Sequence, residues 1–406
     1  MTPGLAFFYG GLVKASSVVS MMMMSFGSLG LIGVLWVIYG YAISFANRGT
    51  GEFVGIDGIF GIDLQKLFVN DITQLALKGD GSQLALAGFQ GTFAIITVAL
   101  ISGAIADRVR FGAWMIFAGL WATFVYFPVA GWVFNFTAVD GKITDGGWLV
   151  KDVGLLDFAG GTVVEIASGA SALALSLVVG KRFGFAKGMH APHNVPLTLI
   201  GAGILWFGWF GFNAGSELMA DGVATIAFGN TLVAGVGGLI SWSLYDRIAL
   251  GKPTAVGAAS GAVAGMVAIT PSCAFLDPEW ALLLGLIVGV VCGLAIELKW
   301  ILGFDDSLDV VGIHLVGGII GTLFIGLFGR GVGLFFGHGF EQLGRQAIGV
   351  VVVGVYSFAL AYAIGWLLQK TVGFRVTSTD EIAGIDNVIH GEYAYDPKDP
   401  RWSWRG

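Results

Sequence analysis

The chain has 406 residues, of which 56% are hydrophobic and only 12% are charged, and its formal net charge is −6. Soluble domains carry about 25% charged residues. A core of this length cannot bury so much apolar surface, so lipid must be the solvent for much of the chain. The negative net charge gives no support for nucleic-acid binding.

Ten apolar segments are long enough to cross a bilayer, which requires roughly 20 residues. They lie near 17–46, 85–106, 111–134, 156–180, 196–218, 222–245, 254–275, 280–298, 307–328 and 346–369. The chain opens on a shorter apolar stretch, TPGLAFFYGGLV (2–13), which reads as the end of a helix whose beginning is missing. These patterns predict an all-α polytopic membrane protein with a transmembrane domain over 1–370 and a polar tail over 371–406.

The basic residues of the short connections indicate an orientation, because Lys and Arg accumulate on the cytoplasmic side of membrane proteins. They fall in alternate connections and are Lys14, Arg108, Arg110, Lys181, Arg182, Lys187, Arg247, Lys252 and Lys299. The other connections include the acidic segment 47–84 and LDPEW at 276–280, which we expect to face outward. We therefore predict a multi-pass protein of the cell membrane whose tail, 371–406, is cytoplasmic.

Two spans that lie five apart share a faint pattern. DFAGGTVVEIASG (157–169) and DVVGIHLVGG (309–318) each have an Asp near the start and one ionisable residue further in. An odd number of spans between related segments is typical of the inverted repeats found in many transporters. The pattern predicts two inverted repeats of five helices, with Asp157 and Asp309 capping helix N-termini.

The ionisable residues further in are Glu165 and His314, both inside predicted spans. An ionisable side chain at such a position is costly and needs a reason. Each is either a structural partner across a helix interface or a polar site in a conduction path. The second interpretation is favoured, because a buried charge offers no clear net stability over an apolar core.

Aromatic residues form a second pattern. FQGTF places Phe89 and Phe93 one helical turn apart, and LWFGWFGFNAGS carries a run of rings that ends near Ser216. Such rings commonly pack or anchor at a membrane interface, and alternatively they form a cation–π cage for a small ammonium-like cation. The pattern alone leaves both interpretations open.

Two further patterns have structural interpretations. Gly257, Gly261 and Gly265 form consecutive GxxxG spacings, which predict close packing of their helix against a neighbour. His190 and His193 lie in a loop with no further ligand nearby, so we expect a structural role for them and predict no metal site.

In chain order, a set of segments resembles the ammonium transporter family (Amt, Mep and Rh proteins). The segments are TPGLAFFYGGLV (2–13), FQGTFAIITVALISGAIADRVRF (89–111), DFAGGTVV (157–164), WFGWFGFNAGS (206–216), SGAVAGMVAITP (260–271), DDSLDVVGIH (305–314) and VGFRV…GID…HGEYAY (372–395). The resemblance implies an eleven-helix fold, here with a truncated first helix, that acts as a transporter and not as an enzyme. It also implies a homotrimer with one narrow hydrophobic pore in each subunit, no cofactor, and a PII-type signalling protein as partner of the tail.

The same resemblance implies an outer site that recruits ammonium. The matching residues are Phe89, Phe93, Phe134, Trp132, Ser216 and Asp157. Phe134 stands at the position of the family's usual Trp, and Trp132 lies half a turn before it, so the aromatic cage is expected to be weaker or differently built. Asp157 matches a residue that supports the site structurally.

Below that site the resemblance implies a gate and a proton relay. Phe93 and Phe212 match two stacked phenyl rings that gate the pore. His314 matches the second of two pore histidines, and Glu165 replaces the first, a departure also seen in some fungal members. This replacement leaves the handling of the proton open.

Elementary physical chemistry agrees with this function. Ammonia in neutral water is almost wholly protonated to ammonium. Desolvation of this cation in a narrow apolar pore is very costly, whereas neutral ammonia can cross. We expect capture of ammonium, or of its analogue methylammonium, followed by deprotonation and passage of ammonia with or without the proton. The alternatives are an ammonium sensor, a membrane enzyme, for which no catalytic motif is found, and a cation or water channel.

Overall fold

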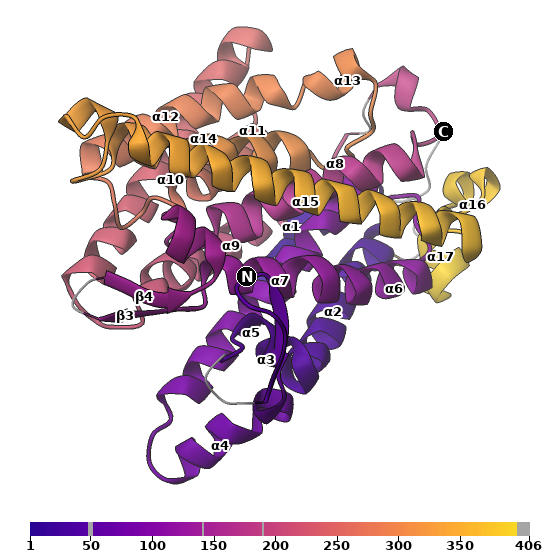
Figure 1. The fold of residues 1–406 in the computed structure, drawn as a ribbon. Helices are drawn as coiled ribbons and strands as arrows, with labels where there is room; N and C mark the ends of the chain where they lie inside the picture. Colours follow the sequence, from indigo (N-terminus) through magenta and orange to yellow (C-terminus); the bar gives the residue numbers. More distant parts are fainter. Residues whose placement is uncertain (48–51, 140–141, 189–190, 396–406) are drawn as a thin grey trace.

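The computed structural model describes residues 1–47, 52–139, 142–188 and 191–395, and helices packed side by side make up most of it (Figure 1). The helices are α1 (Thr2–Leu12), α2 (Val18–Leu35), α3 (Tyr41–Ser44), α4 (Asn70–Leu77), α5 (Ser82–Ile101), α6 (Phe111–Trp121), α7 (Phe127–Val133), α8 (Ala167–Val179), α9 (Val195–Ala214), α10 (Gly222–Ala249), α11 (Ala255–Ile269), α12 (Pro278–Ala295), α13 (Leu298–Leu302), α14 (Val316–Phe328), α15 (Glu341–Thr371), α16 (Ser378–Ala383) and α17 (Ile385–His390). Two antiparallel hairpins join β1 (Phe53–Ile56) to β2 (Phe60–Asp63) and β3 (Phe136–Val139) to β4 (Lys142–Gly146).

The membrane spans agree with the hydropathy pattern. Within the described residues, nine helical segments are long and apolar enough to cross a bilayer. The tenth predicted span, 254–275, is shorter than expected, because α11 ends at Ile269 and turns follow. Since nearly all of α11 is buried among other helices, protein rather than lipid surrounds it. The predicted all-α polytopic fold is confirmed, with two small hairpins added to it.

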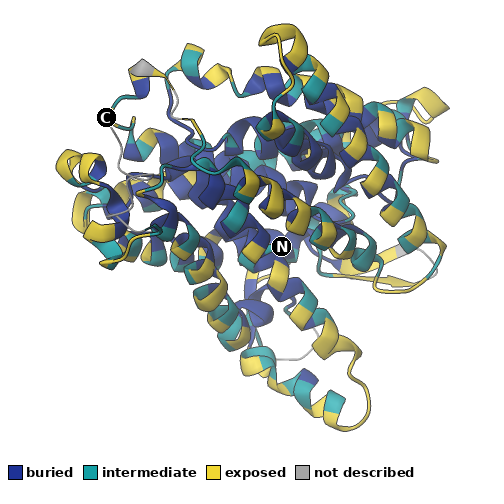
Figure 2. Cartoon of the chain, turned by 180° about the vertical axis from the view of Figure 1, so that it is seen from behind, coloured by how far each residue is buried: buried dark blue, intermediate teal, exposed yellow. Residues whose placement is uncertain are grey.

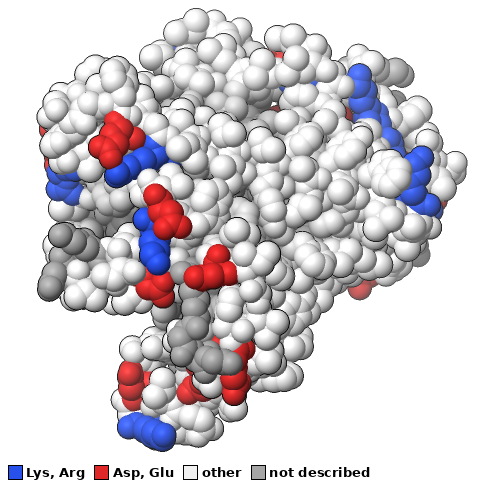
Figure 3. All heavy atoms as spheres, in the orientation of Figure 1, with Lys and Arg blue, Asp and Glu red and all other residues white. Residues whose placement is uncertain are grey.

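The outer surface of the bundle is apolar. Phe207 is 81% exposed, and Ile248 and Ile301 are each 77% exposed. Figure 3 shows charged side chains gathered toward the ends of the molecule, with a broad uncharged surface between them. A surface of this kind is stable against lipid and not against water.

One end of the bundle, here called the tail end, consists of the connections after α1, α5, α8 and α13 together with residues 372–395. Arg108 is fully buried there and donates hydrogen bonds to the carbonyl oxygens of Gly180 (2.9 Å) and Asp305 (2.5 Å). Arg375 of the tail donates to Glu381 at 2.7 Å. Arg108 therefore joins the connections after α5, α8 and α13 at the end of the molecule that also carries Arg375.

The opposite end, here called the hairpin end, carries both hairpins and α4. The Trp132 indole donates to the carbonyl oxygen of Ile59 at 2.5 Å, which ties the β1–β2 hairpin to α7. The segment with α4 projects from the body of the molecule, and its surface is mostly exposed (Figures 1 and 2). The predicted polar connection 47–84 thus contains a hairpin and a helix that the sequence pattern did not indicate.

Glycines allow the predicted close packing of α11. A Cβ atom on Gly261 would lie 2.4 Å from the carbonyl oxygen of Gly238, and one on Gly265 would lie 2.2 Å from that of Ala234. Both oxygens belong to α10, so the helix backbones approach as closely as the GxxxG pattern predicted.

Candidate functional site

Two helices begin with a π-helical turn that a carboxylate caps. The turn Gly161–Ile166 precedes α8, and Asp157 accepts hydrogen bonds from the backbone N–H groups of residues 160, 161 and 162 at 2.8, 2.6 and 2.8 Å. The turn Val311–Leu315 precedes α14, and Asp306 accepts from the N–H of Val311 at 2.7 Å. A carboxylate at such a position satisfies free donors and meets the positive end of the helix dipole.

The capping role predicted for Asp309 is therefore wrong. Its side chain accepts a hydrogen bond from the ammonium group of Lys299 at 2.5 Å, and its backbone lies in the left-handed region with φ +63°. Lys299 is only 2% exposed, so it needs a carboxylate partner nearby. Asp306 caps instead, and it stands eight positions before His314, as Asp157 stands eight positions before Glu165.

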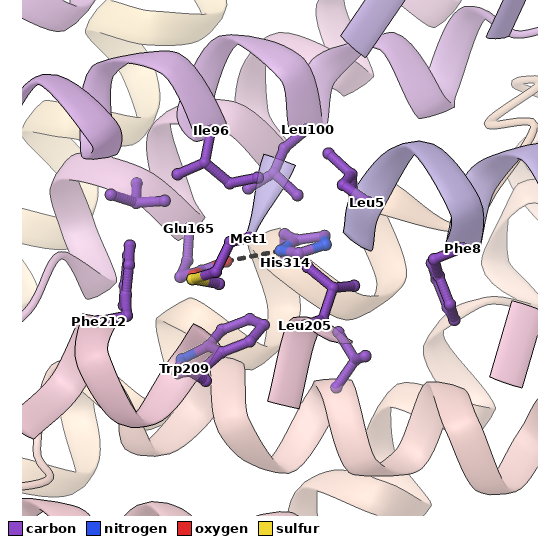
Figure 4. A pocket seen from close by; sticks show the side chains of 12 residues that line it. Met1, Leu5, Phe8, Ile96, Leu100, Glu165, Leu205, Trp209, Phe212 and His314 are labelled. Atoms are coloured by element: carbon purple, nitrogen blue, oxygen red, sulfur yellow. Dashed lines mark hydrogen bonds and ion pairs between the residues drawn. The ribbon is translucent and has the colours of Figure 1, made fainter. Parts of the chain in front are cut away.

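Glu165 and His314 lie on these two π-helical turns and contact each other. His314 Nδ1 and Glu165 Oε2 are 2.6 Å apart, and both residues are almost fully buried (Figure 4). The helices approach here because Gly318 faces the glutamate: a Cβ on Gly318 would lie 2.8 Å from the Cβ of Glu165. The two ionisable residues picked out from the sequence thus form one hydrogen-bonded pair that can share a proton.

A narrow cavity surrounds this pair (Figure 4). Its volume open to the centre of a water-sized molecule is ≈ 10 Å³, about enough for a single water. It is lined by Met1, Leu5, Phe8, Ile96, Leu100, Val164, Glu165, Leu205, Trp209, Phe212, Val263 and His314. The side chains of the wall are therefore apolar except for Glu165, His314 and the indole of Trp209.

Two stacked rings close the cavity toward the hairpin end. The centroids of Phe93 and Phe212 are 4.1 Å apart with the ring planes 13° apart, and the two residues are 1% and 5% exposed. Phe89 packs edge-on against Phe93 at 4.9 Å. A molecule that passes between the hairpin end and the cavity must displace these rings.

Above the stacked rings lies a larger hollow, here called the vestibule, of ≈ 580 Å³. Phe134, Asp157 and Ser216 line it, and the Phe134 ring contacts Phe93 edge-on at 6.0 Å. The Ser216 hydroxyl donates to the carbonyl oxygen of Phe212 at 2.7 Å, which leaves the lone pairs of its oxygen to accept from a cation. The vestibule thus combines ring faces with an oxygen acceptor, the groups that an ammonium ion requires.

Of the residues predicted for the outer site, Phe89, Phe93 and Trp132 are not among those that line the vestibule. Phe89 and Phe93 lie at the ring stack. Trp132, predicted beside Phe134, packs elsewhere. Its ring packs 4.8 Å from Tyr356 and 5.9 Å from Trp148, and its indole N–H is engaged with Ile59. Residues two apart on a helix point in different directions, so only one of the two aromatics can face the vestibule. That residue is Phe134.

The histidine predicted to be structural, His193, contacts the tail. Its Nε2 lies 2.8 Å from the Tyr395 hydroxyl and its Nδ1 lies 2.9 Å from the carbonyl oxygen of Val13. His190 lies outside the described residues. Within the described residues, no group of three or more His, Cys, Asp or Glu side chains is placed to hold a metal ion.

Comparison with known proteins decides the family. The family model described as Ammonium Transporter Family matches residues 1–395, nearly the whole chain. The chain belongs to the ammonium transporter family. This is a family of transporters and not of enzymes.

Family relatives and structures agree with this assignment. An ammonium transporter of Mycobacterium tuberculosis is 48% identical, with 98% of this chain and 87% of the relative covered. Among solved structures, one titled Sensor Amt Protein has a TM-score of 0.85 at 28% identity and covers 95% of this chain and 94% of its own. The Mep2 structure of Candida albicans has a TM-score of 0.81 at 30% identity and covers 98% and 88%.

Two features of the site escaped the sequence analysis of this family member. Asp306 could have been found from its spacing to His314, which repeats the spacing of Asp157 to Glu165. Lys66 also lines the vestibule, and no local pattern distinguishes it from the other lysines of the chain.

Proposed function

We propose that this chain transports ammonium by capturing the cation in the vestibule, removing a proton, and conducting ammonia through the apolar cavity. One observation carries the proposal: the Phe93–Phe212 stack separates a vestibule suited to a cation from a cavity suited to a neutral molecule. Ammonium would lose its hydration in that cavity at great cost, whereas ammonia would not. Capture would use Phe134 and Ser216 of the vestibule wall together with Phe89 and Phe93 at the ring stack, with Asp157 holding the vestibule wall.

We propose further that the Glu165–His314 pair relays the proton. The contact of 2.6 Å and the apolar surroundings support this role, because no other ionisable side chain lines the described part of the cavity. If the proton crosses with ammonia, transport carries charge.

Uptake of methylammonium, together with growth of an ammonium-uptake-deficient yeast on low ammonium, tests the transport proposal. The expected result is restored growth and saturable uptake. A correctly targeted protein that does neither contradicts transport. Competition by potassium separates the transporter from a general cation channel, because a channel would conduct both ions.

We also propose an orientation and an assembly. The tail end, with its basic connections, would face the cytoplasm from the cell membrane, and residues 371–406 would form a tail distinct from the transmembrane domain 1–370. A homotrimer and a PII-type signalling protein at the tail would complete the assembly. Membership of the family and the network of tail contacts at this end support both.

An ammonium-sensing role is the second candidate, because one solved structure that the chain resembles is titled Sensor Amt Protein. Ammonium-evoked currents distinguish the two roles. A transporter passes sustained current or substrate flux, whereas a pure sensor binds ammonium without sustained flux.

A further inference from the structure

Lys66 holds a position in the vestibule wall that suits a cation. It comes from a short 3-10 turn (Leu64–Val69) between β2 and α4, in the projecting segment of the hairpin end. Its ammonium group donates to the carbonyl oxygen of Phe45 at 2.5 Å and lies 5.5 Å from the centroid of the Tyr41 ring. Phe45, Tyr41 and Lys66 all line the vestibule together with Ser216.

The Tyr41 ring lies under this cation, and the Phe45 ring supports that ring from behind. Tyr41 and Phe45 are stacked with centroids 5.2 Å apart, and both are almost fully buried. A ring face together with a carbonyl oxygen is a combination that stabilises a primary ammonium group. Burial lowers the pKa of Lys66, and the nearby carboxylates of Asp63 and Asp71 oppose that shift.

Lys66 differs in charge from the other ionisable residues that line the vestibule. Among the described residues that line it, Lys66 is the one cation, and Asp157 and Glu217 are the anions. Asp157 already accepts several backbone hydrogen bonds, so much of its charge is satisfied locally. Glu217 in the vestibule wall and Asp63 and Asp71 near Lys66 make the local potential negative, and the positive charge of Lys66 offsets part of their attraction for a cation that enters.

We propose that Lys66 is a tethered cation that limits the affinity of the vestibule for ammonium. Its charge repels an arriving ammonium ion, and its head group occupies a cation-binding position between the Tyr41 ring and the Phe45 carbonyl oxygen. A transport site must bind its substrate strongly enough to fill yet weakly enough to release it toward the pore. Lys66 shifts that balance toward release. The inference rests on the transport function proposed above.

The test replaces the charge and keeps the bulk. Lys66→Met in proteoliposomes should lower the ammonium concentration for half-maximal current by about threefold at low salt, the size expected from one partly screened charge. High ionic strength should reduce this shift. Lys66→Arg keeps the charge and should shift half-saturation less than Lys66→Met does.

Lys78→Met is the matched control, because Lys78 lies on the same projecting segment but is exposed and does not line the vestibule. It should move half-saturation much less than Lys66→Met. Lys66→Gln serves as a second neutral variant if the methionine variant does not fold, and should shift half-saturation in the same direction.

Several outcomes overturn the role of Lys66. These are an unchanged or raised half-saturation in both neutral variants, an equal shift in Lys66→Arg, or an equal shift in Lys78→Met. Wild-type protein in the same preparation separates this inference from transport itself. Wild type without current refutes transport, whereas active wild type with unshifted Lys66 variants refutes only the tethered cation.

Discussion

At the scale of single residues, the first prediction concerns the Glu165–His314 pair, which we propose as the proton relay. Glu165 and His314 share one short contact in an apolar cavity, so a change to either leaves the other without its partner. Glu165→Gln preserves the shape and removes the titratable group. We expect a reduced ammonium-evoked current or an altered pH dependence, measured in proteoliposomes across a pH series.

Glu165→His supplies the control for this variant, because the family resemblance implies a histidine at this position. It should retain activity, with changed selectivity against potassium. A Glu165→Gln protein that matches wild type in current, pH profile and selectivity would show that Glu165 is structural.

A second residue-scale prediction concerns the aromatic wall of the vestibule. Phe134→Trp places an indole where the phenyl ring now lies, and indole is the strongest cation–π partner. A gain of roughly 0.5–1 kcal/mol would lower half-saturation for methylammonium about two- to fivefold. The kinetics of methylammonium uptake measure this half-saturation concentration.

Trp132→Phe is the comparison for this change, since Trp132 does not line the vestibule. It removes the hydrogen bond to Ile59 and should lower thermal stability more than it changes half-saturation. The opposite ranking of the two variants would place the recruitment site around Trp132.

At the scale of elements, the connections of the tail end are joined by buried charges. Burial by itself would raise the pKa of Asp305, but the guanidinium groups of Arg108 and Arg182 hold this pKa below its ordinary value of 3.8. The Arg182 side chain lies 2.9 Å from the Asp305 carboxylate. Asp305→Asn leaves the two arginines without this counter-charge and should cost about 3–5 kcal/mol of stability at neutral pH.

The pH dependence follows from the sign of the shift. Because the folded-state pKa is depressed, the stabilisation is present above 3.8 and is lost as the pH falls through the lower folded value. Thermal unfolding of wild type and Asp305→Asn in mild detergent should therefore differ most at neutral pH and converge in strong acid. A gap that does not narrow on acidification would assign the stabilisation to packing.

At the scale of the whole molecule, we expect three copies of the chain in the membrane. Native mass spectrometry in mild detergent should show a trimer, and a monomer would refute it. Deletion of residues 378–406 should leave the trimer intact and alter regulation by a PII-type protein, because residues 378–395 lie at the tail end. The deletion retains Phe374, which is fully buried, so the end of α15 keeps its packing.

Much of this molecule could be predicted from its sequence. Long apolar runs located the spans, and the ionisable residues inside them picked out Glu165 and His314. The family motifs picked out Phe93 and Phe212. The structure brings the members of each pair into contact. These predictions succeed because lipid requires long apolar helices, and because an ionisable group inside one is rare enough to be noticed.

The tertiary structure decided what depends on direction and on distant neighbours. It showed that Phe134 and not Trp132 faces the vestibule, that Asp306 and not Asp309 caps the second π-helical turn, and that Lys66 reaches the vestibule wall. The vestibule is assembled from segments far apart in the chain. Hydropathy describes each segment separately, so it does not predict which side chains of different segments come into contact.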